Sequence, residues 1–89
     1  MTAVLAKAAD NLSETAIDEE IVVMSLASGN FYSLTGTGRA IWLLIDGNRD
    51  LAAIVAALAA DYGVAAAEIA GEVEAFVSDL TAAGLIRHG

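Results

Sequence analysis

The apolar residues of this chain follow two different spacings, and the change between them near Thr35 limits the folds that the chain can adopt. Before the change, residues 21–26 (IVVMSL) and 31–34 (FYSL) are short runs rich in β-branched, apolar and aromatic residues, separated by a turn that contains Gly29. This pattern is typical of a β-hairpin. After the change, Ala40, Ile41 and Leu44 recur at the spacing of a helix, and Asp46-Gly47 supplies a stop.

Two further helices are predicted downstream. Asp50 is placed to cap a helix over residues 51–62, and Gly63 suits the left-handed position that follows a helix. A third helix spans about residues 66–83 and ends at Gly84, after which Leu85 and Ile86 are expected to fold back onto the core. Residues 15–17 are a candidate first strand, and Thr35 or Thr37 a candidate helix cap.

The order of elements is therefore three strands followed by three helices, which predicts one small α+β domain. Residues 1–12 show no clear period and are predicted to be a loose N-terminal arm, with the folded domain covering residues 13–89.

The composition excludes several classes of function. The chain has 89 residues, a net charge of -8 and no cysteine, which argues against nucleic-acid partners, disulfides and thiolate metal sites. The most apolar window, residues 51–60, is much shorter than the roughly 20 residues that span a bilayer. With no pattern of a signal peptide at the start, a cytoplasmic protein without a membrane segment is expected.

Motifs that would indicate an enzyme are incomplete. The stretch TGTG at residues 35–38 lacks the third glycine of a dinucleotide fingerprint and the Gly-Lys-Ser/Thr of a phosphate loop, so it is interpreted as a strand-to-helix turn. His88 is the only histidine and is expected to be solvent-exposed, and the consecutive carboxylates of residues 18–20 do not form a plausible metal cluster. No catalytic residue, cofactor or metal is predicted.

A series of short motifs resembles the PqqD family. It comprises residues 20–24 (EIVVM), 29–34 (GNFYSL), 38–44 (GRAIWLL), Asp46-Gly47, the helix from Leu51, residues 61–62 (DY), 73–77 (VEAFV), Leu80 and residues 84–86 (GLI). The resemblance covers about residues 13–86. One departure is Thr35, where the family often has asparagine, although threonine can also cap a helix.

The resemblance implies a winged-helix-like fold of three antiparallel strands followed by three helices, and a non-catalytic role. Members of the family are peptide chaperones, also called RiPP recognition elements. They bind the leader of a ribosomally synthesised precursor peptide and present the peptide to a modifying enzyme, such as a radical-SAM maturase or a leader peptidase. The leader adds as a strand to the edge of the third strand, against the third helix.

Three alternatives stay open at this stage. An acidic carrier protein would be modified on Ser78, but its sequence, Ser-Asp-Leu, reverses the Asp-Ser-Leu order of acyl carriers. A winged-helix regulator would place an acidic third helix against DNA phosphates, which is electrostatically unfavourable. A homodimerisation module would pair the same strand edge with a second copy of the chain.

The candidate binding residues lie on that edge strand and on the third helix. By alternation, Tyr32 and Leu34 are predicted to face the core, whereas Phe31 and Ser33 point the other way. Phe31, Val73, Phe76 and Val77 are predicted to line side-chain pockets. On helical spacing, Glu68, Glu72 and Asp79 form an acidic shoulder beside the apolar stripe, which would favour a leader carrying Lys or Arg. The predicted peptide-binding residues are Asn30, Phe31, Tyr32, Ser33, Leu34, Glu72, Val73, Phe76 and Val77.

Overall fold

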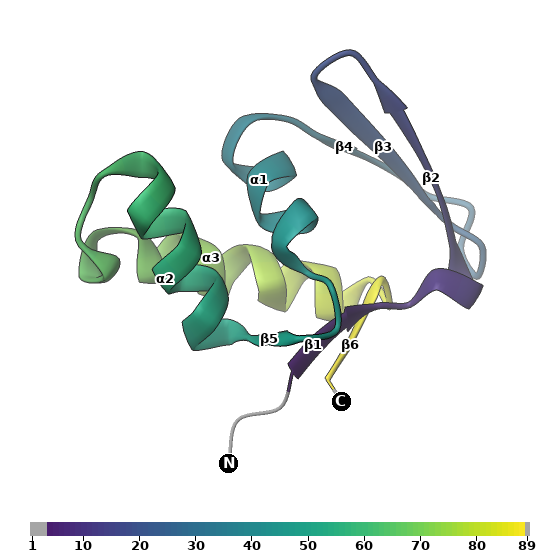
Figure 1. Cartoon of the computed structure of the whole chain (residues 1–89). Coiled ribbons are helices and arrows are strands. Elements are labelled where there is room, and N and C mark those ends of the chain that lie inside the picture. The colour runs from purple at the N-terminus through teal and green to yellow at the C-terminus, as the bar shows by residue number, and fades with distance from the viewer. Residues whose placement is uncertain (1–3, 89) are drawn as a thin grey trace.

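The computed structural model of the chain describes residues 4–88 and has the predicted α+β architecture, a three-stranded antiparallel sheet followed by three α-helices in a winged-helix-like arrangement (Figure 1). The elements in chain order are β1 (Val4–Lys7), the 3-10 helix η1 (Ala9–Asn11), β2 (Leu12–Ile17), β3 (Glu20–Ser25), β4 (Phe31–Leu34), α1 (Gly36–Leu44), β5 (Arg49–Asp50), α2 (Leu51–Tyr62), α3 (Ala66–Ala82) and β6 (Ile86–His88).

The larger sheet has the strand order β2-β3-β4, with both pairings antiparallel. Val22 on the central strand lies opposite Thr15 on one side and Ser33 on the other. Burial alternates along β3, because Ile21 and Val23 enter the core while the residues between them face outward. The sheet therefore has one face in the core and one facing solvent.

The helix ends follow the predicted chemistry in part. The Asp50 carboxylate accepts a hydrogen bond from the backbone N–H of Ala53 at 2.8 Å, and Gly63 follows α2 with a left-handed backbone, as predicted. Thr35 occupies the cap position of α1, but its side chain makes no capping hydrogen bond. The predicted cap at this helix is therefore correct only in position.

Residues 4–12 are not a loose arm, so that prediction is wrong for all of the arm that the structure describes; residues 1–3 of the predicted arm lie outside the described residues. Strand β1 forms the centre of a second sheet, β5-β1-β6, and Leu5 is 1% exposed. Beyond β1, the backbone N–H of Ala8 donates to the carbonyl of Leu85 at 2.9 Å. Sequence patterns did not show this sheet because its strands have only two to four residues and lie far apart in the chain.

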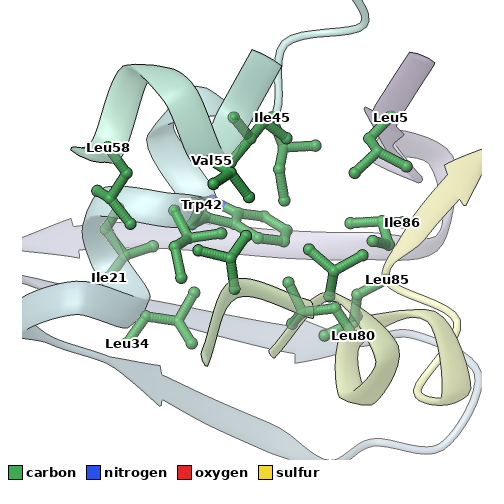
Figure 2. Packing of buried hydrophobic residues seen from close by; sticks show 14 of the residues in the cluster. Leu5, Ile21, Leu34, Trp42, Ile45, Val55, Leu58, Leu80, Leu85 and Ile86 are labelled. Atoms are coloured by element: carbon green, nitrogen blue, oxygen red, sulfur yellow. The ribbon is translucent and has the colours of Figure 1, made fainter. Parts of the chain in front are cut away.

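Trp42 of α1 lies at the centre of the core and is fully buried (Figure 2). The labelled residues around it come from β1, β3, β4, the C-cap of α1, α2, α3 and the C-terminal segment: Leu5, Ile21, Leu34, Ile45, Val55, Leu58, Leu80, Leu85 and Ile86. The predicted return of Leu85 and Ile86 onto the core is confirmed, since they are 0% and 4% exposed. Both sheets and all three α-helices thus share one core.

The packing of β1 predicts the outcome of a paired substitution. Leu5→Ala is expected to lower the free energy of unfolding by about 2–5 kcal/mol, because it removes a fully buried side chain and leaves a cavity. Leu26→Ala, the same substitution at a side chain that is 54% exposed, is expected to change it by less than about 0.5 kcal/mol. Urea unfolding monitored by Trp42 fluorescence measures both values, and equal stabilities would contradict the packed position of β1.

Candidate functional site

Strand β4 is an edge strand of the larger sheet. The backbone N–H and C=O groups of its successive residues point alternately toward β3 and away from the sheet. The N–H of Ser25 donates to the carbonyl of Asn30 at 2.9 Å, and the register continues from this pair through Val23 opposite Tyr32. Because hydrogen-bonded and non-hydrogen-bonded pairs alternate in an antiparallel ladder, Tyr32 and Leu34 direct their backbone groups toward β3. The N–H and C=O groups of Phe31 and Ser33 therefore point away from the sheet, along its open edge.

The side chains of β4 divide between the two faces of the sheet as the alternation predicted. Leu34 is 5% exposed, and Tyr32 is half-buried and packs against the core. Phe31 on the opposite face is 69% exposed, and the hydroxyl of Ser33 donates a hydrogen bond to the carboxylate of Glu20. Phe31 is thus an exposed aromatic side chain on a strand with one open edge.

A hollow of about 380 Å³ lies between β4 and α3. Leu34 and Leu80 are its buried apolar residues, while Phe76 is half-buried and Asp79 is exposed. The residues lining it are Tyr32, Ser33, Leu34, Phe76, Asp79 and Leu80. An apolar hollow with one carboxylate therefore lies directly beside the open edge of β4.

The Phe76 ring comes close to Gly38 on α1. A Cβ atom at position 38 would lie 3.3 Å from two carbons of the ring, closer than most real Cβ contacts, so glycine permits this approach. Of the two glycines in TGTG, only Gly36 has a positive φ, of 54°. The interpretation of this stretch as a strand-to-helix turn agrees with the positive φ of Gly36, whereas Gly38 permits the close packing of Phe76.

The structure brings together some of the nine predicted binding residues and separates others. Four of them line the hollow between β4 and α3: Tyr32, Ser33, Leu34 and Phe76. Asn30 and Phe31 are exposed at the start of β4, and Glu72 is exposed on α3 without lining the hollow. Whether any of the nine binds a peptide stays a prediction.

The prediction that Val73 and Val77 line pockets beside β4 is wrong. Val73 is 0% exposed and Val77 is 5% exposed, and both belong to the hydrophobic core. They share the apolar stripe of α3 with Phe76 and Leu80, but only Phe76 and Leu80 of these four residues line the hollow. Helical spacing identified the stripe, and it could not show which of its residues would be buried in the core and which would line the hollow.

Asp79 and Leu80 line the hollow but were absent from the predicted binding residues. The signal was present in the sequence, since Asp79 and Leu80 lie three and four residues after Phe76 and so share its side of the helix. Asp79 was predicted only as part of the acidic shoulder, whose relation to β4 depends on how α3 packs.

The histidine and the consecutive carboxylates considered for catalysis or metal binding do not come together in one site in the described part of the chain. His88 is exposed, as predicted, and its Nε2 lies 3.0 Å from the hydroxyl oxygen of Thr81, beside a hollow on the side of α3 that carries Ser78. Within residues 4–88, no three His, Cys, Asp or Glu side chains come together as a metal-binding group. In the same range, no helix is both long enough and apolar enough to cross a membrane.

The fold and the edge strand define a small winged-helix-like domain with a strand available for pairing. The family model for coenzyme PQQ synthesis protein D (PqqD) matches residues 20–86, and the chain belongs to the PqqD family. A solved structure described as TbiB1 in complex with the TbiA(beta) leader peptide is similar over 98% of this chain and 95% of that one, with 25% sequence identity and a TM-score of 0.79. No match was found among curated proteins.

The different burial of Phe31 and Leu34 on β4 predicts different effects of their substitution on stability. Phe31→Ala is expected to change the free energy of unfolding by less than about 0.5 kcal/mol, because the ring is mostly exposed. Leu34→Ala is expected to lower it by about 2–5 kcal/mol, since that side chain is in the core. Urea unfolding of both variants provides the measurement, and a large loss for Phe31→Ala would show that Phe31 is needed for folding.

Proposed function

We propose that this protein is a non-catalytic peptide chaperone that binds the leader segment of a ribosomally synthesised precursor peptide. The leader adds as a strand to the open edge of β4 and packs against α3. The rest of the precursor stays outside the groove, where a modifying enzyme such as a radical-SAM maturase or a leader peptidase can reach it.

The observation that carries the proposal is the position of the β4 edge beside the hollow. The outward N–H and C=O groups of Phe31 and Ser33 offer two donors and two acceptors to an extended peptide. The hollow next to them accepts a side chain that points from such a peptide toward α3. Main-chain hydrogen bonds supply affinity in this mode of binding, and side-chain pockets supply selectivity.

The solved structure with a leader peptide supports the same proposal. TbiB1 is similar to this chain over nearly the full length of both proteins, and that structure is described as a complex with a leader peptide. The similar region includes β4 and α3, the two elements that line the hollow here. Strand addition also gives a role to an edge that would otherwise be available for aggregation.

Backbone amides provide a direct test. With the leader encoded beside the gene as titrant, we expect NMR shifts across β4 and α3, together with slower hydrogen exchange at Phe31 and Ser33. The amides of Tyr32 and Leu34, already directed toward β3, should change much less in exchange. Unchanged shifts on β4 and α3 would contradict the proposal, and light scattering would show whether a second copy pairs with the same edge instead.

A proline substitution isolates the contribution of the edge. Ser33→Pro removes an outward N–H without removing a bond to β3, and proline is tolerated in that position on an edge strand. We expect it to weaken leader binding about fivefold or more, since one main-chain hydrogen bond is worth about 1 kcal/mol and the ring also obstructs the incoming strand.

Two matched variants control for other effects of this substitution. Ala16→Pro places proline at an outward N–H on the opposite edge of the sheet, because the register of β2 with β3 turns Ala16 away from β3. Ser33→Ala removes only the hydroxyl that bonds Glu20. Calorimetric titration should show near wild-type affinity for both, and equal losses in the two proline variants would contradict binding at β4.

A further inference from the structure

The register of an added strand determines which of its side chains can enter the hollow. Neighbouring strands place directly opposite residues on the same face, so the peptide residues opposite Tyr32 and Leu34 would point toward α3. These two positions are two residues apart in the peptide, roughly 7 Å along the strand. The residues opposite Phe31 and Ser33 would point to the outer face. This assignment holds for a parallel or an antiparallel peptide.

The two positions meet different chemistry on α3. Phe76 contacts Gly38 on the helix that follows Leu34, which places its ring at the Leu34 end of the hollow. Asp79 is three residues further along α3, a rise of about 4.5 Å, and among residues 4–88 it is the only charged residue lining the hollow. One position therefore meets an aromatic ring and apolar side chains, and the other meets a carboxylate.

The negative charge of Asp79 lies at an electrostatically unfavourable position on α3. It is in the last turn of α3, where the carbonyl ends of the helix disfavour negative charge, and that turn contains no basic residue. Within the described part of the chain, the ion pairs are Lys7 with Glu14, Arg49 with Asp46 and Arg87 with Asp10. None of them includes Asp79, so no ion pair within the described residues neutralises this carboxylate.

Building on the proposed function, we propose that Asp79 makes the groove selective for peptides with Lys or Arg two positions from an apolar anchor residue. The anchor fills the apolar end of the hollow beside Phe76 and Leu34, and the basic side chain extends to the Asp79 carboxylate. The chain's net charge of -8 adds a long-range attraction for such a peptide, and this attraction weakens as salt increases.

Selection from a phage-displayed random-peptide library tests the spacing. On the wild-type protein, we expect enriched peptides to pair an aromatic or aliphatic residue with Lys or Arg two positions away. On Asp79→Asn the basic position should be lost while the anchor remains. Glu74→Gln is the matched control, because it removes the same charge from an exposed residue of the same helix outside this hollow.

A double-mutant cycle measures the pair itself. For one selected peptide and its Lys→Gln counterpart, Asp79→Asn is expected to weaken binding of the Lys peptide about two- to fivefold and to leave the Gln peptide almost unchanged. Glu74→Gln should affect both peptides equally. Additive effects of Asp79→Asn and Lys→Gln would overturn the selectivity.

The outcomes separate this inference from the proposed function. Enriched peptides that have an anchor but no preferred basic position, and that lose binding in Ser33→Pro, would overturn the role of Asp79 and leave strand addition intact. Enriched peptides that bind Ser33→Pro as tightly as the wild type would overturn both proposals. A selection that enriches no peptide would also count against both.

Discussion

The rest of this structure depends on the buried indole of Trp42 and on the interactions that it makes with both sheets. An indole N–H in the core needs an acceptor, and here it donates to the Glu14 carboxylate of β2 at 2.9 Å. Lys7 of β1 lies 4.8 Å from the centre of the Trp42 ring and 3.8 Å from the same carboxylate. One side chain of α1 is thereby joined to a strand of each sheet, so the two sheets and the helices form one unit.

This arrangement determines how the β4 edge is presented. Helix α1 follows β4 directly, and the Phe76 ring of α3 packs against its Gly38. The width of the hollow between β4 and α3 therefore depends on packing that involves α1, a helix that does not itself line the hollow. A pre-formed hollow beside a pre-formed strand lowers the ordering cost of binding an extended peptide.

Much of the fold could be predicted from local patterns. The alternation in β4 correctly assigned Tyr32 and Leu34 to one face and Phe31 to the other. Asp50 correctly predicted the start of α2, and Gly63 and Gly84 correctly predicted the ends of α2 and α3. These features depend on residues close together in the sequence. Strands β1, β5 and β6 could not be predicted in this way, because each is stable only when paired with segments far away in the chain.

The candidate site shows the same division. The sequence by itself determined that the chain would form the three strands of the larger sheet and three α-helices. It also determined that Phe31 and Ser33 would share one face of an edge strand and that α3 would carry an acidic shoulder, because these features follow from periods of two and 3.6 residues. Only the tertiary structure decided that Phe76 and Asp79 would line the hollow while Val73 and Val77 would be buried. That choice depends on the rotation of α3 against the sheet, which is set by the joint packing of residues from every layer around Trp42.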